Sequence, residues 1–202
     1  MLKDISDSFL KRDVDEAGMI NQDTFYKLFT LLAGQTGRLL NKSELSGTIG
    51  IDNKTIDNYL MVLRKCFHIE LVRPFSTNLR KELIKMPKVF LYDNGMRNAM
   101  LNRFTAFHDR EDKGELLENY VFRRFAEIHE PENIRYWRIT DNKEIDFIIS
   151  FDFRSGWAYE VKMDCRPRKR AGIFAFRELY PEFKFEMLTY EFCNDTQQVL
   201  KL

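Results

Sequence analysis

The chain has 202 residues, of which 44% are hydrophobic and 14% aromatic, a composition that supports packed cores and excludes a disordered chain. Basic and acidic residues nearly balance, at 32 against 31, so any attraction to nucleic acid must come from local patches. The three cysteines form no C-x-x-C pair and no apolar run reaches ~20 residues. These features argue against a zinc ribbon and a membrane partner, and we expect a cytoplasmic protein.

The first half of the chain predicts three helices followed by two extended segments. Hydrophobic residues recur at helical spacing over residues 24–36, about 42–48 and 53–66. Asn41 and Asp52 are favoured N-cap residues and begin the second and third helices. Extended runs follow at 67–72 and 88–92 with a polar stretch between them. This order is typical of a winged-helix domain, which we expect over residues 21–100.

A winged helix can place its third helix in the major groove of DNA and its wing on the phosphate backbone. The candidate phosphate contacts in this half of the chain are basic: Lys54, Arg64, Arg80, Lys81 and Lys85. Asp57 on the third helix would repel a phosphate. Winged helices also serve as plain interaction modules, so both roles stay open.

After an expected linker over residues 101–113, a second domain is predicted over residues 114–202. It begins with a helix on which Glu118 shares a face with Val121 and Phe125, by i+3 and i+7 spacing. A carboxylate on the inward face of a helix suggests a functional role. A favourable interaction with the N-terminal end of the helix dipole would also explain it.

Three runs rich in β-forming residues follow, at 134–138, 144–149 and 157–163, and predict an antiparallel meander. Strict alternation would put Ile145 and Phe147 on one face and Asp146 on the other. A hairpin that turns around Phe153 would place Asp146 opposite or near Glu160, with Cβ atoms ~4.5–5.5 Å apart. Two carboxylates that close repel each other unless a cation lies between them.

This pair suits Mg²⁺ or Mn²⁺, because Mg²⁺ prefers one or two carboxylates and keeps water and phosphate in its other positions. The predicted metal ligands are Glu118, Asp146 and Glu160. Lys162 would orient the attacking water and stabilise developing charge, so the predicted catalytic residues are Lys162, Asp146 and Glu160. The plain alternative is a Glu–Lys pair on a solvated strand face.

The densest basic run of the chain comes next and consists of Arg166, Arg168, Lys169 and Arg170. It opens a predicted helix that leads to a strand over residues 183–188. Beside a metal site these residues would suit a nucleic-acid backbone, and a solvated helix start is an equal alternative.

Several stretches resemble the C-terminal region of prokaryotic AAA-type ATPases: residues 32–41, 74–81 and 85–95, then Glu118-Asn119, Glu144-Ile145-Asp146-Phe147 and Glu160-Val161-Lys162. In such proteins a P-loop ATPase module precedes a winged-helix segment and a domain of uncharacterised function. The resemblance implies that this domain has a restriction-endonuclease-like, PD-(D/E)XK fold, an α/β arrangement with a central mixed sheet flanked by helices. It also implies a P-loop ATPase domain or subunit as a partner.

No G-x-x-x-x-G-K-[ST] motif occurs, so we expect no ATP site in this chain. Residues 1–20 resemble the end of the ATPase module, which suggests a C-terminal fragment or a shortened relative. The leading hypothesis is a Mg-dependent, nuclease-like module that binds nucleic acid, DNA rather than RNA; cleavage of both strands would suggest a homodimer. The alternative is a non-catalytic protein-interaction or DNA-binding module that keeps the nuclease fold, and a third hypothesis is a transcription regulator acting through the winged helix alone.

Overall fold

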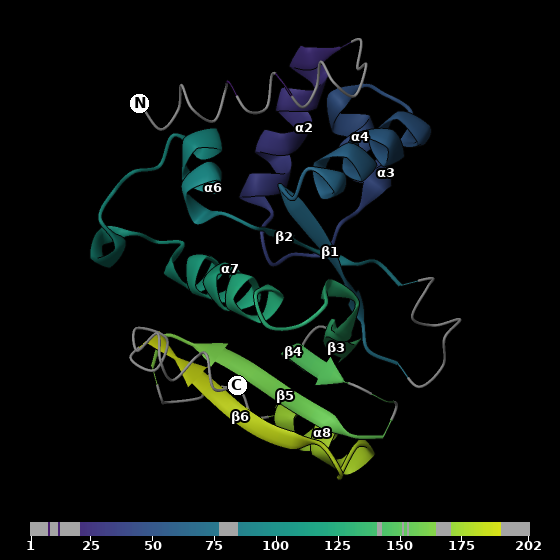
Figure 1. Ribbon diagram of the computed structural model, residues 1–202, viewed down its shortest axis with the longest axis vertical. Coiled ribbons are helices and arrows are strands. Elements are labelled where there is room, and N and C mark those ends of the chain that lie inside the picture. Colours follow the sequence, from purple (N-terminus) through teal and green to yellow (C-terminus); the bar gives the residue numbers. More distant parts are fainter. Residues whose placement is uncertain are drawn as a thin grey trace. The chain divides into compact units, whose positions relative to one another are not determined.

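The computed structural model describes residues 8, 12, 21–76, 85–140, 143–150, 152, 154–164 and 171–190. The chain is mixed α/β, with six strands in the order β2-β1-β3-β4-β5-β6 and helices before and between them along the sequence (Figure 1). It divides into two compact units. Unit 1 consists of Met1–Leu71 and Lys88–Arg110, and unit 2 consists of Val72–Pro87 and Glu111–Leu202.

Unit 1 contains the three predicted helices, α2 (Gln22–Gly34), α3 (Lys42–Ile49) and α4 (Asn53–Lys65). Each has a side-chain N-cap, in which Asn21, Asn41 or Asp52 accepts a hydrogen bond from a backbone N–H of the first turn. Such caps pair N–H groups that have no partner within the helix. Gly50 ends α3 in the left-handed conformation, at φ 80°, and allows the tight turn into α4.

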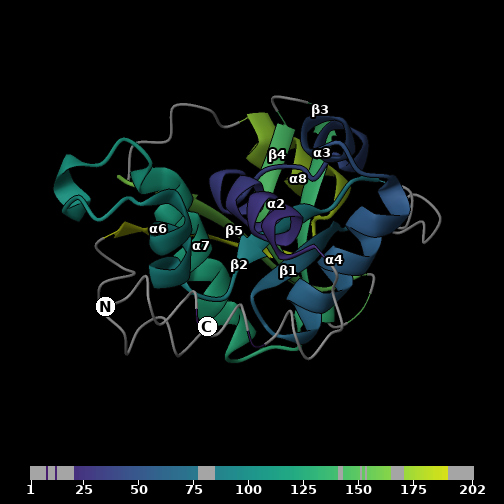
Figure 2. The ribbon, with the colours of Figure 1, turned by 90° about the horizontal axis from the view of Figure 1, so that it is seen from above.

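The apolar faces of these helices form one core together with β1 (Ile69–Pro74), β2 (Lys88–Leu91) and α6 (Asn94–Leu101). The Tyr92 N–H donates to the His68 carbonyl at 3.2 Å, so the end of β2 lies beside the start of β1. Helix α6, which packs on the same core through Met96 and Met100, was not predicted (Figures 1 and 2). Gly95 and two asparagines weaken its sequence signal, and its Asp93 cap supplies the start.

A buried carboxylate ties these elements of unit 1 together. Glu70 on β1 is 7% exposed and accepts hydrogen bonds from Arg64 Nε at 2.8 Å and from the Tyr92 hydroxyl at 3.2 Å. Its Oε1 also accepts the N–H of Leu71 at 2.9 Å. The charge of Glu70 is thus fully satisfied, which burial of a carboxylate requires. Arg64, predicted as a phosphate contact, is therefore engaged within unit 1.

Unit 2 contains the predicted meander, β3 (Ile134–Thr140), β4 (Lys143–Ser150) and β5 (Gly156–Lys162), with antiparallel pairing. Strand β6 (Lys184–Thr189) runs parallel to β5, after the helix α8 (Ala171–Leu179). The end of β1 pairs in parallel with β3 at Arg73 and Pro74. A sheet with both parallel and antiparallel pairs is therefore confirmed. The described residues also contain two single-turn 3-10 helices, Phe107–Asp109 in unit 1 and Pro131–Asn133 in unit 2.

Helix α7 (Lys113–Ala126) and helix α8 cover opposite faces of this part of the sheet (Figure 1). Phe125 of α7 contacts Tyr159 of β5, with ring centroids 4.8 Å apart. Phe176 of α8 belongs to a different cluster that includes Ala158, the neighbour of Tyr159. Because adjacent residues of a strand point to opposite faces, the two helices lie on opposite sides.

The predicted alternation along β4 was wrong in one respect, because the strand contains a bulge. Arg135 of β3 pairs with Ile148, whereas Trp137, two residues on, pairs with Ile145. Two consecutive residues of β4, Asp146 and Phe147, therefore lie opposite a single residue of β3. The bulge moves Ile145 away from the face of Phe147 and into the α8 cluster with Ile148.

Several predictions fall on parts of the chain that the structure does not describe. Four candidate phosphate contacts of the basic run, Arg166, Arg168, Lys169 and Arg170, lie outside the described residues, as do Arg80, Lys81 and nearly all of residues 1–20. The expected domain boundaries remain predictions. The segment Val72–Pro87, which we expected within the winged helix, belongs to unit 2 in the structure.

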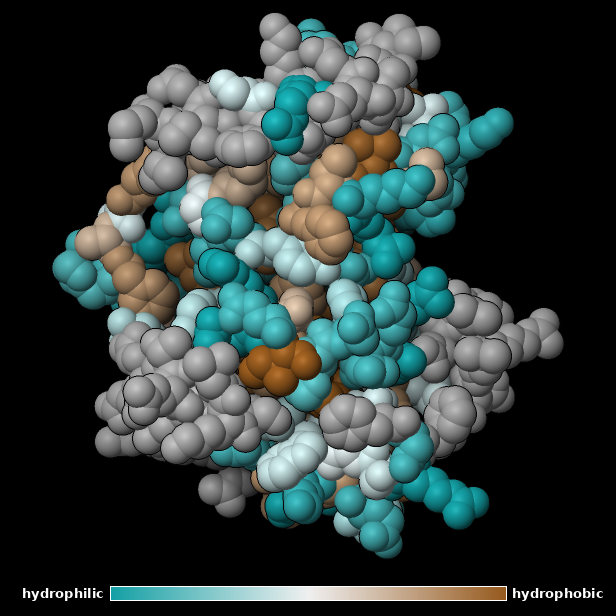
Figure 3. All heavy atoms as spheres, viewed as in Figure 1, coloured by the Kyte–Doolittle hydropathy of each residue, from teal (hydrophilic) through white to brown (hydrophobic). Residues whose placement is uncertain are grey.

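The described side chains leave no extended apolar surface on the face seen in Figure 3, where hydrophobic spheres form small separate patches among hydrophilic ones. None of the helices in the described part of the chain has both the length and the apolar character needed to cross a bilayer.

Candidate functional site

Pairing between β4 and β5 sets the positions of the two central carboxylates. Phe147 pairs with Tyr159, and Ile148 pairs with Ala158. If this register is extended by one residue, Asp146 comes opposite Glu160, and the two side chains share the ammonium of Lys162. This is the arrangement that a hairpin centred on residue 153 predicts.

Lys162 joins the two carboxylates. Its Nζ lies 2.7 Å from Oε1 of Glu160 and 3.6 Å from Oδ2 of Asp146. The lysine side chain is 37% exposed, whereas those of Glu160 and Asp146 are 9% and 14% exposed. A partly accessible ammonium thus neutralises two largely buried carboxylates, and three of the four predicted site residues come together.

The carboxylate of Asp146 is oriented by the backbone of the neighbouring strand. Its Oδ2 accepts the N–H of Val161 at 2.8 Å, next to the β4 bulge. Bulges commonly turn a side chain towards a site at the end of a ladder. The other oxygen, Oδ1, accepts no hydrogen bond from the residues that the structure describes.

Glu160 has a buried oxygen that lacks a protein partner. Its Oε2 makes no hydrogen bond within the described residues, although the residue is only 7% exposed. Burial raises the pKa of the Glu160 carboxyl to about 7; the charges of Asp146 and Glu118 add to the rise, and Lys162 opposes it. A buried, unpaired carboxylate oxygen is costly, so it calls for a ligand or a proton.

Glu118 on α7 acts on the site through its charge. It raises the pKa values of both Glu160 and Lys162. Burial alone would lower the pKa of the Lys162 ammonium, but the three carboxylates outweigh burial and raise it. In the described part of the chain, however, no three His, Cys, Asp or Glu side chains are grouped closely enough to hold a metal ion. The structure thus does not gather Glu118 with Asp146 and Glu160 as a third ligand.

The remaining geometry fits a divalent cation held by two carboxylates. Asp146 Oδ1 and Glu160 Oε2 are the oxygens that have no partner among the described residues, and Mg²⁺ ordinarily takes one or two carboxylates plus water. The Lys162 ammonium already shows that positive charge is favourable at this point.

The sequence did not reveal the two features that orient Asp146, which are the bulge and the Val161 N–H. Both depend on how β3 and β5 pair with β4, and no local pattern encodes that pairing. Of the basic candidates outside this site, Lys54 is exposed on α4, and Lys85 donates to the Arg138 carbonyl at 3.2 Å.

Fold and site together define a two-unit, mixed α/β protein whose second unit carries a buried pair of carboxylates. Residues 1–106 match the family described as Domain of unknown function (DUF8612), and the chain belongs to this family. Residues 113–199 match a second family, described as Domain of unknown function (DUF4143).

The chain is also similar to uncharacterized proteins of Mycobacterium tuberculosis and Haemophilus influenzae. It is 25% identical to one of Mycobacterium tuberculosis over 163 residues, which are 79% of this chain and 37% of that protein. It is 27% identical to one of Haemophilus influenzae over 154 residues, 73% of this chain and 36% of that protein. The chain thus spans little more than a third of these relatives. No solved structure matches it.

Proposed function

We propose that unit 2 is a Mg²⁺- or Mn²⁺-dependent, nuclease-like module of the PD-(D/E)XK type that acts on DNA phosphodiesters. The observation that carries the proposal is the convergence of Asp146, Glu160 and Lys162, with a buried oxygen of Glu160 left without a partner. Such an arrangement sets two acidic side chains beside a cation, the Lys162 side chain, which is 37% exposed.

The order of elements supports the same proposal. A helix bearing Glu118 precedes a strand bearing Asp146, and an antiparallel strand bearing Glu160 and Lys162 follows. A helix and a parallel strand then complete the sheet. In unit 1, three helices and two neighbouring strands support a winged helix. The resemblance to AAA-type ATPases leads us to propose a P-loop ATPase domain or subunit as the partner.

Each residue of the site has a distinct part in the proposed chemistry. Asp146 and Glu160 would hold the cation, and Glu118 would add negative charge nearby. When bound, Mg²⁺ would supply a water of lowered pKa and neutralise charge on the phosphate. Lys162 would then be free of its two carboxylates, so that its ammonium could bind a phosphate oxygen and orient the attacking water.

Nicking of supercoiled plasmid tests this proposal. We expect wild-type protein to nick DNA with Mg²⁺ or Mn²⁺ and not with EDTA. Asp146→Asn, Glu160→Gln and Lys162→Met should each lose at least ~100-fold in rate, the usual cost of removing an electrostatic contribution to catalysis. Glu182→Gln, which removes an exposed charge from the same unit, should keep the wild-type rate. Equal nicking by all variants would indicate a contaminating nuclease and refute the proposal.

One observation favours a second candidate, a non-catalytic interaction module that keeps the fold. Lys162 already neutralises Asp146 and Glu160 without a metal. A folded protein that binds neither Mn²⁺ nor Mg²⁺ at millimolar concentration and nicks no DNA would support this candidate.

A further inference from the structure

The outer face of α4 in unit 1 presents a straight stripe of four exposed side chains. The buried face holds Ile56, Tyr59, Leu60 and Leu63. The exposed stripe consists of Lys54, Asn58, Met61 and Lys65. Steps of four, three and four residues keep these side chains on one side of a helix. Met61 is 48% exposed, so the apolar member of the stripe is not part of the core.

The two lysines of the stripe carry their charge without a protein partner. Among the described residues, no ion pair or hydrogen bond is made by the side-chain ammonium of Lys54 or of Lys65. Arg64 is different, because its guanidinium is bound to Glu70 at 2.7 Å. The stripe therefore has one uncommitted positive charge near each end of the helix.

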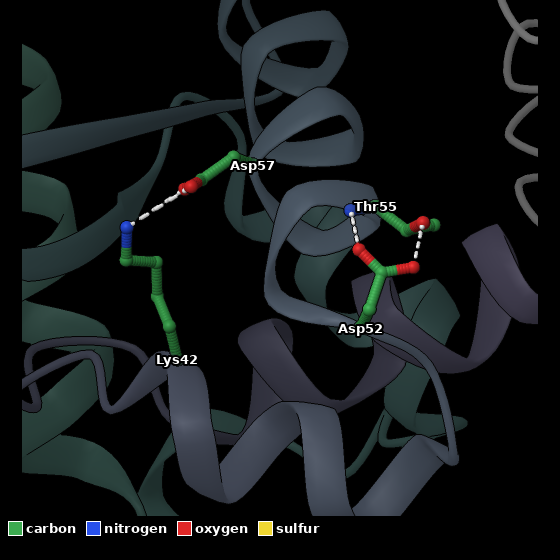
Figure 4. A network of polar contacts seen from close by, with 4 residues as sticks. All are labelled: Lys42, Asp52, Thr55 and Asp57. Atoms are coloured by element: carbon green, nitrogen blue, oxygen red, sulfur yellow. Dashed lines mark hydrogen bonds and ion pairs between the residues drawn. The ribbon is translucent and has the colours of Figure 1, made fainter.

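The acids of α4 and of its N-cap are already engaged (Figure 4). Asp57, the one acidic residue of α4, accepts hydrogen bonds from Nζ of Lys42 on α3 at 2.8 and 3.2 Å. Asp52 caps the helix by accepting hydrogen bonds from the N–H of Thr55 at 2.9 Å and from the hydroxyl of Thr55 at 2.7 Å. Repulsion of a phosphate by Asp57, expected from the sequence, is thus countered within unit 1.

The dimensions and chemistry of the stripe match the major groove of DNA. At 1.5 Å per residue, Lys54 and Lys65 lie roughly 16 Å apart along the helix, enough to reach phosphates on both sides of a groove about 12 Å wide. An Asn amide can pair with adenine and an apolar side chain can contact the thymine methyl. Helix α3 and the turn at Gly50 precede α4, as in helix-turn-helix proteins.

We propose that α4 binds double-stranded DNA. Lys54 and Lys65 contact phosphates, and Asn58 and Met61 face the bases. Lys42 neutralises the charge of Asp57, which would otherwise repel the DNA backbone. The proposal concerns unit 1 alone and does not depend on a metal site in unit 2.

Fluorescence anisotropy of a labelled DNA duplex, titrated with the full chain at low salt and without metal, tests this directly. Lys54→Ala and Lys65→Ala should each weaken binding and reduce the slope of log K against log salt by about 0.9, the value for one phosphate contact. Asn58→Asp should weaken binding by roughly 10-fold or more, because it adds a carboxylate to the stripe. Lys27→Ala is the matched control, since Lys27 is exposed on α2 and has no partner among the described residues.

The shielding of Asp57 has its own variants. Lys42→Ala should weaken binding, Asp57→Asn should tighten it, and the double variant should bind at least as well as wild type. Circular dichroism would verify that each variant is folded. The proposal is overturned if the duplex does not bind at low salt or if Lys27→Ala loses as much as the α4 variants. Tighter binding of single-stranded RNA or anionic vesicles would also overturn it. Because the titration contains no metal, its result does not depend on the nuclease proposal.

Discussion

The carboxyl group of Glu160 is the most perturbed acid near the site, and its environment has a consequence for stability. Burial and two neighbouring carboxylates raise its pKa from 4.5 to about 7, despite Lys162. The folded state therefore holds this proton more tightly than the unfolded state does. Protonation of Glu160 therefore adds to the free energy of unfolding. This stabilisation is fully present below about pH 4.5 and is lost as the pH rises through about 7.

Glu160→Gln should accordingly remove part of the fall in unfolding free energy between about pH 5 and about pH 8. Urea unfolding of wild type and variant across this window measures the difference. Glu182→Gln, an exposed acid in the same unit, should leave the wild-type slope unchanged. Parallel pH profiles for wild type and Glu160→Gln would mean that the folded-state pKa of Glu160 is not raised.

Phe67 places an aromatic residue in a backbone conformation that favours glycine. Phe67 follows α4 and has φ 55°. Its N–H donates to the Arg64 carbonyl and the N–H of His68 donates to the Leu63 carbonyl, which are the two hydrogen bonds of a Schellman motif. The residue is 69% exposed, and its ring makes an edge contact with Tyr92. The left-handed conformation costs a residue with a Cβ about 1–2 kcal/mol.

Phe67→Gly should therefore be more stable than Phe67→Ala by about 1 kcal/mol, since both lose the ring and only Gly relieves the strain. Guanidinium unfolding midpoints measure this difference. Equal stability of the two variants would contradict the conformation of Phe67 described above.

The residue scale also shows what sequence alone could predict about the site. The period of two in β5 correctly put Glu160 and Lys162 together, and the hairpin length put Asp146 near them. Alternation failed at Ile145 because the bulge arises from pairing with β3, a strand outside the hairpin. The unpartnered oxygen of Glu160 was equally unpredictable, since burial depends on the whole unit.

At the scale of elements, the packing of α8 on β4 depends on the absence of a side chain at Gly172. A Cβ there would lie 2.4 Å from the backbone oxygen of Glu144 and 2.9 Å from its nitrogen. Backbone atoms cannot move aside as a flexible side chain can. Gly172 is thus required for the close approach of the two elements.

Gly172→Ala should destabilise the protein by about 1–3 kcal/mol, the usual cost of overpacking. Gly47→Ala is the control, because nothing lies within 4 Å of a Cβ in that α3 position. It should be neutral or stabilising by about 0.5–1 kcal/mol. Thermal unfolding followed by circular dichroism measures both variants. A Gly172→Ala protein as stable as wild type would contradict the described contact.

Elements with strong local signals were predicted well. The starts of α3 and α4 were visible in Asn41 and Asp52, whose caps the structure confirms. Helix α6 was missed because its eight residues include Gly95 and carry little helical signal of their own beyond the preceding cap residue, Asp93. The grouping of Val72–Pro87 with unit 2 reflects pairing of β1 with β3, which local sequence does not encode.

At the scale of the molecule, two independent divisions of the chain nearly coincide. The family matches cover residues 1–106 and 113–199, and the two structural units change over at residues 110 and 111. The segment Val72–Pro87 is the exception, since it lies within the first match and belongs to unit 2. The chain's net charge of +1 adds no general attraction for DNA, so both proposals depend on local charges.

The central claim is that Asp146 and Glu160 hold a divalent cation, and calorimetric titration of Mn²⁺ into the full chain tests it most directly. Wild type and Glu182→Gln should bind one Mn²⁺ per chain, more tightly as the pH rises above 7 and Glu160 loses its proton. Asp146→Asn and Glu160→Gln, verified as folded, should show no binding heat at the same concentrations. Absence of binding by wild type at millimolar Mn²⁺, or equal binding by all four proteins, would contradict the account.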